Sequence, residues 1–475
     1  MTQTASPRLR DAETALRGDA LPQRVAGAAR ALRGHGVRPG DRVLVRGNNS
    51  LDYVVTLLAL IHLDVSLVPV DHRTSPADVS AMAARCDARW LVGDGSRPDR
   101  FPAERVLDPR TLAGVPTPDG ASAPAGIDLE PWFRRRDALV LWSSGTTGRP
   151  KGIVKSGSAV RDNTLRTIEA MGYRPDDVLA PLLPFSHQYG LSVVLVWWLA
   201  RCTLLVTPYQ RLDLAVGQAA AGGATAVDAA PSTYHTLLQV VRRRPDVRAG
   251  LAGVRIWGVG GAPLPRPLAK TFQETMGHPL LDGYGLTELG NVALATPEFP
   301  VGCGRALPGI DLRVVRPDGT PAGPGEPGEI EVRSPGLMEG YLAPDRTLDP
   351  VVRTGWYPTA DLGHLDAEGN LHVHGRNRAV HRLGFTLYPE SLERKAEHCG
   401  RPVKVVAAQH VRRGASLHFV VADPDDGEPC DWRRRLAPHL ADYEQPNSVH
   451  VVREFPLGAN GKVDTAALGA LIGVA

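Results

Sequence analysis

The stretch Trp142-Ser143-Ser144-Gly145-Thr146-Thr147-Gly148-Arg149-Pro150-Lys151-Gly152 is the part of this chain that decides its fold. It follows Ala138-Leu139-Val140-Leu141, a short apolar run that predicts a buried strand. The glycines allow positive φ and a close approach of backbone N–H groups to an anion, and Lys151 adds a positive charge. The residues therefore predict a loop that holds the phosphates of a nucleotide. The same composition is also typical of a flexible surface loop, and the spacing is not that of a Walker A loop.

The run S-S-G-T-T-G-R-P-K-G at residues 143–152 resembles the signature loop of the adenylate-forming superfamily. That superfamily includes acyl- and aryl-CoA synthetases, luciferases and the adenylation domains of nonribosomal peptide synthetases. The resemblance implies ATP as cosubstrate. It also implies that the phosphates of ATP are bound by Ser143, Ser144, Gly145, Thr146, Thr147, Gly148 and Lys151.

Composition limits the class of protein. The chain has 475 residues, of which 43% are hydrophobic and 22% charged, and this predicts a globular protein of two or three domains. The net charge of +3 is too small to favour nucleic acid or an anionic membrane as the main partner. Five scattered cysteines without metal-ligand spacing are typical of a reducing compartment. The N-terminus has no signal-peptide pattern and no stretch predicts a membrane span, so the expected location is cytoplasmic.

Helical and strand patterns alternate along the first third of the chain. Residues 25–32 predict a helix, 42–45 a strand, 50–63 a helix capped at Asn49-Ser50, and 65–70 a strand. This order predicts an α/β fold with parallel-rich sheets. Residues 309–333 alternate short strands with turns and predict a β-rich subdomain. We expect a large N-terminal domain of several subdomains at 1–377 and a small, mobile α+β C-terminal domain at 378–475.

A second motif, Asp282-Gly283-Tyr284-Gly285-Leu286-Thr287-Glu288, has the side chains that a nucleotide site needs. A tyrosine ring offers a flat face for a base, and Mg²⁺ prefers carboxylate oxygens together with phosphates. By resemblance, Asp282 lies in the cofactor site, Tyr284 stacks on the adenine, Thr287 contacts the α-phosphate and Glu288 holds Mg²⁺. The Gly-Gly-Ala-Pro-Leu element at 260–264 resembles the border of the adenine and acyl pockets, which adds Gly261 and Ala262 to the cofactor site.

The acyl pocket is expected near Pro184-Phe185-Ser186-His187-Gln188-Tyr189-Gly190. By resemblance, His187 lies close to the acyl and thioester tunnel and is a candidate catalytic residue, although a buried core histidine remains an alternative. Amino-acid-activating relatives typically have an acidic residue in this element. No acid occurs between Asp177 and Asp213, so an α-amino acid is disfavoured. The polar and aromatic residues near this element favour an aryl or functionalised acid.

Three positions in the C-terminal third complete the predicted site. Thr359-Ala360-Asp361-Leu362-Gly363 resembles the family pattern T-G-D-x-G, which implies that Asp361 binds the ribose hydroxyls. Arg376 matches an arginine that reaches ribose or phosphate. The hinge residue that normally follows is Arg378 here and has no acidic neighbour. Lys462, in the sequence Asn460-Gly461-Lys462, resembles the lysine that stabilises negative charge on the carboxylate and α-phosphate.

Together these motifs predict an AMP-forming ligase. The resemblance implies that ATP and Mg²⁺ convert a carboxylic acid to an acyl-adenylate with release of pyrophosphate. A thiol then takes the acyl group, and coenzyme A is the favoured acceptor. Two alternatives remain. The enzyme loads the phosphopantetheine of an acyl or peptidyl carrier protein in a biosynthetic pathway, or the chain is a nucleotide-binding homologue without turnover.

Overall fold

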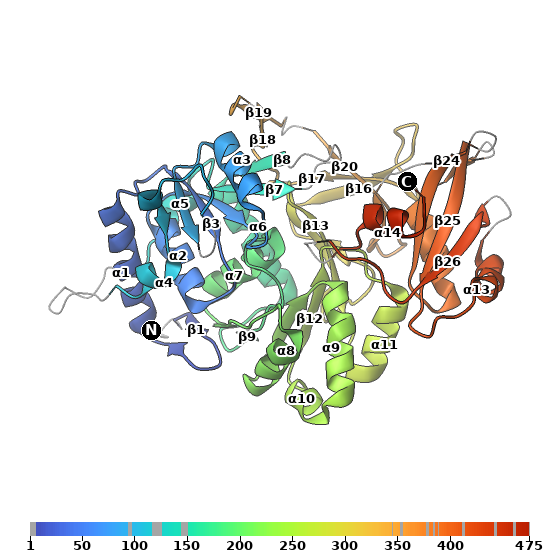
Figure 1. The fold of residues 1–475 in the computed structure, drawn as a ribbon, viewed down its shortest axis with the longest axis horizontal. Coiled ribbons are helices and arrows are strands. Elements are labelled where there is room, and N and C mark those ends of the chain that lie inside the picture. Colours follow the sequence, from blue (N-terminus) through green and yellow to red (C-terminus); the bar gives the residue numbers. More distant parts are fainter. Residues whose placement is uncertain are drawn as a thin grey trace.

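The computed structural model describes residues 6–93, 97–115, 126–143, 151–343, 345–351, 355–376, 380–382, 385–387, 389–410, 414–440, 444–458 and 462–474. Two large mixed sheets and the helices around them form the larger part of the molecule (Figure 1). A smaller lobe with a sheet of its own contains the C-terminal residues, drawn in orange to red in Figure 1. The α/β fold class predicted from the sequence is confirmed.

The first large sheet has eight strands, and β7 lies near its centre. Strands β3 to β7 pair in parallel, and the chain then turns back through an antiparallel β7–β8 pair. The predicted phosphate loop connects these two central strands. In spatial order the strands are β19 (Leu348–Pro350), β18 (Gly340–Leu342), β8 (Lys151–Lys155), β7 (Leu139–Ser143), β4 (Ser66–Val70), β3 (Arg42–Arg46), β5 (Trp90–Gly93) and β6 (Val106–Leu107).

The second large sheet has nine strands, and its central strands β9 to β13 pair in parallel. Parallel strands bring their carboxyl ends to one edge of a sheet, which is where ligands bind in open α/β sheets. In spatial order the strands are β15 (Arg305–Ala306), β14 (Gly290–Leu294), β13 (Leu281–Leu286), β12 (Ile256–Gly260), β11 (Ala226–Ala229), β9 (Val178–Leu179), β10 (Thr203–Leu205), β1 (Arg8–Arg10) and β2 (Ala15–Leu16).

One hydrophobic core joins the two sheets. It combines strand residues of both sheets with almost fully apolar helix α2 and with α7. A separate core lies between the nine-stranded sheet and α8, α9, α10 and α11. The helices are α1 (Ala20–His35), α2 (Leu51–His62), α3 (Pro76–Cys86), α4 (Pro109–Ala113), α5 (Glu130–Phe133), α6 (Gly157–Met171), α7 (Gln188–Ala200), α8 (Leu212–Ala221), α9 (Pro231–Arg243), α10 (Pro245–Gly250) and α11 (Arg266–Met276), with a 3₁₀ turn at Ala103–Arg105.

The β-rich subdomain predicted from residue 309 onwards is a four-stranded antiparallel sheet. Its strands in spatial order are β16 (Asp311–Val315), β17 (Gly328–Arg333), β20 (Tyr357–Leu365) and β21 (Leu371–Arg376). Strand β21 is the last element before the expected hinge residue Arg378, which lies outside the described residues.

The C-terminal lobe has its own hydrophobic core, which contains Phe419, Trp432 and Leu436. Its three-stranded sheet has the order β24 (Val403–His410), β25 (Gly414–Ala422) and β26 (Ser448–Val452). A short hairpin and small helices complete it. These elements are β22 (Val380–Arg382), β23 (Phe385–Leu387), α12 (Pro389–Ala396), α13 (Pro429–Leu436) and α14 (Thr465–Leu471), with 3₁₀ turns at Glu397–Cys399 and Ala437–His439.

Most of the predicted elements are found with shifted ends. Ser50 caps α2 as predicted, because its side chain accepts a hydrogen bond from the Tyr53 N–H. Helix α13 ends at Leu436, since Pro438 has no N–H to continue it. The described part of residues 97–137 contains the short elements β6, α4 and α5. Within the described chain, no helix is both long and apolar enough to cross a bilayer.

Candidate functional site

The end of β13 is the centre of the candidate site. Tyr284 lies on this strand and Asp361 on β20, and the Tyr284 hydroxyl donates a hydrogen bond to the Asp361 carboxylate at 2.8 Å. Both residues are only 7% exposed. The two residues are 77 positions apart in sequence and lie in contact. One was predicted at the adenine and the other at the ribose. The arrangement positions a carboxylate acceptor beside an aromatic ring, which suits a nucleoside.

Glu288 lies in the turn that follows β13, and Tyr341 connects it to the phosphate loop. The Tyr341 hydroxyl donates to Glu288 Oε1 at 3.1 Å, and the Lys151 ammonium lies 5.2 Å from the centre of the Tyr341 ring. Burial, the hydroxyl of Tyr357 and the Glu288 carboxylate raise the pKa of Tyr341, so it stays a neutral donor. A cation and a carboxylate thus lie on two sides of one phenol, at the expected place of the triphosphate.

Lys155 stabilises the turn that contains Glu288. Its side chain is 2% exposed, and its ammonium donates to the carbonyl oxygens of Gly336 at 2.8 Å and Glu288 at 3.3 Å. Sequence reasoning missed both Lys155 and Tyr341. The signals available were a lysine in an otherwise apolar strand and the pair Gly340-Tyr341, and neither indicates a partner by itself. Thr287 lies half-buried between Leu286 and Glu288 in the same turn.

His187 caps the start of α7 and pairs with Asp71, a residue that sequence reasoning also missed. The His187 Nε2 atom lies 3.0 Å from Asp71 Oδ2, and the histidine side chain remains 41% exposed. Burial acts to raise the pKa of Asp71, but hydrogen bonds from His187 and Arg73 outweigh it and hold the pKa well below its usual value. An ionised Asp71 accepts from Nε2–H, which leaves the Nδ1 lone pair of His187 free to accept a proton.

His187 lies near the nucleotide residues through the residue that follows it. Gln188 Nε2 donates to the carbonyl oxygen of Leu286 at 3.2 Å, directly before Thr287. The first turn of α7 therefore contacts the end of β13. Gly261, at the end of β12, has φ of +81° and open space where a side chain would begin, and Ala262 follows it half-buried. This edge of the sheet is where the acyl pocket was predicted.

Asp282 lies half-buried near the start of β13. Its carboxylate accepts a hydrogen bond from the Cys303 thiol at 3.4 Å, and burial raises the pKa of Asp282 to about 7. The structure thus places this predicted cofactor residue at the other end of β13 from Glu288. Its side-chain hydrogen bond is with Cys303, which lies between β14 and β15, and a contact with the nucleotide stays a prediction.

The remaining predicted residues are placed by their backbone or lie outside the described part. Ser143 ends β7, and Arg376 ends β21 directly opposite Asp361 in the β20–β21 pair. The loop residues Ser144, Gly145, Thr146, Thr147 and Gly148 lie outside the described residues. Lys462 is exposed on the C-terminal lobe, and the N–H of Gly458 donates to its carbonyl oxygen at 2.7 Å.

Ala360 stands where the family motif has a glycine. It has φ of +57°, a left-handed conformation in which the glycine of the usual pattern is unstrained. Replacing Ala360 with glycine is expected to raise the free energy of unfolding by about 0.5–1 kcal/mol, because relief of backbone strain exceeds the added chain entropy. Urea denaturation measures the change. Ala77→Gly, in the exposed first turn of α3, is the control and should lower stability by a similar amount.

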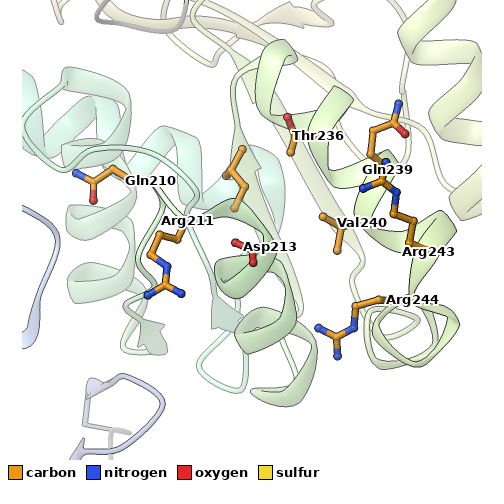
Figure 2. Close-up of a pocket in the computed structure, with 9 residues that line it drawn as sticks. Gln210, Arg211, Asp213, Thr236, Gln239, Val240, Arg243 and Arg244 are labelled. Atoms are coloured by element: carbon orange, nitrogen blue, oxygen red, sulfur yellow. The ribbon is translucent and has the colours of Figure 1, made fainter.

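A separate cavity of about 590 Å³ lies between α8 and α9 on the same lobe (Figure 2). Arg211, Arg243 and Arg244 line it, and none of the predicted site residues does. Gln210 at its rim donates to His72 Nε2 at 2.9 Å, next to Asp71 in sequence. The cavity therefore lies beside the part of the candidate site that contains Asp71 and His187, but it is not part of that site. Among the residues that the structure describes, no cluster of His, Cys, Asp and Glu could hold a metal without further ligands.

Comparison with known proteins gives consistent matches over the whole chain. Residues 8–342 match the family model described as "AMP-binding enzyme". A feruloyl-CoA synthase of Amycolatopsis sp is 28% identical over 480 residues, covering 96% of this chain and 94% of that protein. The fatty acid–[acyl-carrier-protein] ligase ScoC of Streptomyces coeruleorubidus is 28% identical over 470 residues, covering 92% and 87%. ATP-bound MatB from Rhodopseudomonas palustris is similar in structure, with a TM-score of 0.85, 25% identity, and coverage of 99% and 96%.

Proposed function

The chain belongs to the AMP-binding enzymes, the adenylate-forming superfamily, and we propose that it activates a carboxylic acid with ATP and passes the acyl group to a thiol. The observation that carries this proposal is the convergence of Lys151, Glu288, Tyr284 and Asp361 on the end of β13. These four side chains offer a cation, a metal ligand, an aromatic face and a ribose acceptor in one place. The similarity to MatB solved with ATP supports ATP as the nucleotide.

In the first step, one oxygen of the substrate carboxylate attacks the α-phosphorus of ATP. The bond to the bridging oxygen breaks, pyrophosphate leaves with that electron pair, and an acyl-adenylate forms. Positioning and charge stabilisation account for most of the catalysis of such transfers. We assign phosphate binding to Ser143 to Lys151, α-phosphate contact to Thr287, and ribose binding to Asp361 and Arg376. Lys462 stabilises the charge on the reacting oxygens.

Mg²⁺ fits the site without a full set of protein ligands. It usually binds through one or two carboxylates together with phosphates and water. Glu288 supplies such a carboxylate, and only one of its oxygens accepts the Tyr341 hydroxyl. When bound, the ion neutralises phosphate charge. Glu288 would hold the ion, and Tyr341 and Lys155 keep the Glu288 turn in position.

In the second step, a thiol sulfur attacks the acyl carbonyl and AMP leaves. We assign the thiol proton to His187 Nδ1 and the orientation of the ring to Asp71. The C-terminal lobe has its own sheet and core, and we place its boundary at residues 377 and 378. A lobe of this kind can rotate about a short linker between two steps.

The Asp71 assignment predicts an effect on one step only. Asp71→Asn is expected to lower the kcat of thioester formation about 10-fold or more, because the histidine loses its orienting carboxylate. ATP–pyrophosphate exchange should stay within about 2-fold, since adenylation does not use His187. Arg73→Ala is the matched control, because Arg73 is another partner of the Asp71 carboxylate and its removal leaves the Asp71–His187 hydrogen bond in place.

A double-mutant cycle separates positioning from a general structural role. If Asp71 acts through His187, Asp71→Asn should add little to the loss in His187→Ala. Independent, additive losses, or an equal loss of exchange and thioester formation, would contradict the assignment.

Coenzyme A is the acceptor we favour, in line with the feruloyl-CoA synthase. The equal identity to ScoC keeps a carrier-protein phosphopantetheine as the second candidate. The deciding experiment first measures ATP–pyrophosphate exchange over a panel of aryl, short-acyl, dicarboxylic and β-amino acids. It then measures thioester formation with coenzyme A and with holo carrier proteins. If none of the acids in the panel supports ATP–pyrophosphate exchange, the proposed function is rejected and a homologue without turnover is favoured.

A further inference from the structure

Asp228 is a buried carboxylate that the proposed reaction does not use. It lies on β11, is 5% exposed, and accepts a hydrogen bond from the Tyr189 hydroxyl at 2.9 Å through Oδ1. Its other oxygen, Oδ2, has no hydrogen-bond partner of normal geometry among the described residues, and the Tyr173 hydroxyl is its other polar neighbour. Burial raises the pKa of Asp228 to about 6 against the effect of both hydroxyls. None of the ion pairs found among the described residues includes it.

Tyr189 connects this carboxylate to the predicted acyl pocket. It lies in the first turn of α7, two residues after His187, and is half-buried. A side chain at Gly260 of β12 would begin 3.3 Å from its ring, and one at Gly258 would begin 3.1 Å from its hydroxyl and would clash with Asp228. Glycine at position 258 therefore leaves room for the Asp228 carboxylate, and glycine at position 260 allows the close approach of the Tyr189 ring to β12. At Gly261, the next residue, a side chain would meet no atom within 4 Å.

The hydrogen bonding of Tyr189 sets the polarity that it offers to a ligand. Its hydroxyl proton is engaged by Asp228, so the oxygen can only accept from a further neighbour. The carboxylate behind it gives this end of the predicted acyl pocket a negative charge that takes part in no ion pair among the described residues. A buried charge is costly unless it is paired, and a ligand that donates an N–H, above all a cationic one, reduces that cost. An apolar ligand would leave it unpaired.

We propose that Asp228, acting through Tyr189, makes this enzyme select a carboxylic acid that has an amino group remote from its carboxylate. The inference rests on the proposed function and specifies its substrate class. It differs from the recognition of an α-amino acid, for which the element at 184–190 lacks an acidic residue. The amine lies at the Tyr189 hydroxyl, and the carboxylate points towards Thr287 and the nucleotide.

Matched pairs of acids test the proposal. We would measure kcat/KM for ATP–pyrophosphate exchange with 4-aminobenzoate against 4-methylbenzoate, 3-aminobenzoate against 3-methylbenzoate, and 4-aminobutanoate against pentanoate. The wild type should prefer the amino-bearing member of at least one pair by about 10-fold or more, since a site built for a polar group rejects the analogue that lacks it. The aryl and alkyl pairs distinguish a neutral arylamine from an ammonium group.

Two variants locate the source of the preference. Asp228→Asn keeps the shape of the side chain and should reduce the preference to within about 3-fold. Tyr189→Phe removes the hydroxyl alone and should have the same effect, so it decides the matter if Asp228→Asn does not fold. The control is Asp246→Asn, an exposed carboxylate paired with Arg244, which should leave the preference unchanged. Thermal melting confirms that each variant is folded.

Several results would overturn the inference. Equal or better use of every methyl-bearing acid by the wild type would do so, as would a preference that survives both substitutions. Binding of the same pairs, followed by calorimetry, gives a readout that does not depend on turnover. If no acid supports exchange, the proposed function fails, and calorimetry alone then decides whether the pocket prefers an amine.

Discussion

Replacing Lys462 with alanine is expected to lower carboxylate-dependent ATP–pyrophosphate exchange by about 10²–10³-fold, while the affinity for ATP changes little. This is the largest single effect we expect. The Lys462 charge is assigned to the oxygens that become more negative as the carboxylate attacks, so its loss should act on the transition state and not on the bound ground state. Exchange kinetics and equilibrium ATP binding, measured on the same preparation, separate the two.

The Lys462 side chain can be truncated without disturbing the backbone contacts around it. Backbone contacts hold the chain at Lys462, because the Gly458 N–H donates to the Lys462 carbonyl oxygen and Leu457 pairs with Val463. Truncation of its exposed side chain leaves these bonds intact. Lys270→Ala, which removes an exposed lysine from α11, is the matched control. Unchanged exchange in Lys462→Ala, or an equal loss in the control, would remove Lys462 from the reaction.

The sequence alone was sufficient for the elements that depend on local chemistry. The apolar run before residue 143 forms β7, Ser50 caps α2, and the glycines around 260 and 283 end or bend strands of one sheet. These features follow from turn residues, caps and apolar runs that act within a few positions. The order of motifs along the chain then carried the family resemblance and the nucleotide residues with it.

The contacts that hold the site together were not predictable in the same way. Asp71 and His187 are 116 positions apart, and Tyr341 reaches Glu288 across 53. Neither Asp71 nor Tyr341 has a neighbour in sequence that indicates its partner. Their pairing depends on how β4, α7, β13 and β18 come together across two sheets, and this is set by core packing far from the site. The buried charge of Asp228 is another such feature, since an aspartate in a short strand pattern gives no sign of its environment.

The left-handed conformation of Ala360 shows a further limit of prediction from sequence. The sequence revealed that alanine replaces the usual glycine before Asp361, but not that the backbone keeps the conformation of the glycine. Strain is retained here because β20 must place Thr359, Asp361 and their hydrogen bonds where the site needs them. The Asp361 N–H donates to the Thr359 hydroxyl, and that hydroxyl donates to the Ile330 carbonyl oxygen. The strained backbone at Ala360 is thus kept because it holds the Asp361 carboxylate in position.

That carboxylate is the subject of the second large effect. Asp361→Ala is expected to weaken ATP binding by roughly 10²-fold or more, because two hydrogen bonds from ribose hydroxyls to a charged acceptor are lost together. The wild type should also bind 2′-deoxy-ATP more weakly than ATP, whereas the variant should bind the two nucleotides about equally. This loss of discrimination is specific to ribose recognition and would not follow from a general disturbance of the pocket.

The neighbouring tyrosine provides the control for Asp361. Tyr284→Phe removes the hydrogen bond that the Tyr284 hydroxyl donates to Asp361 but retains both the ring and the carboxylate. It should therefore lower ATP affinity much less than Asp361→Ala and should preserve discrimination against 2′-deoxy-ATP. If Asp361→Ala binds ATP with unaltered affinity, or still distinguishes the two nucleotides, the ribose must be held elsewhere. The convergence of residues at the end of β13 would then need another explanation.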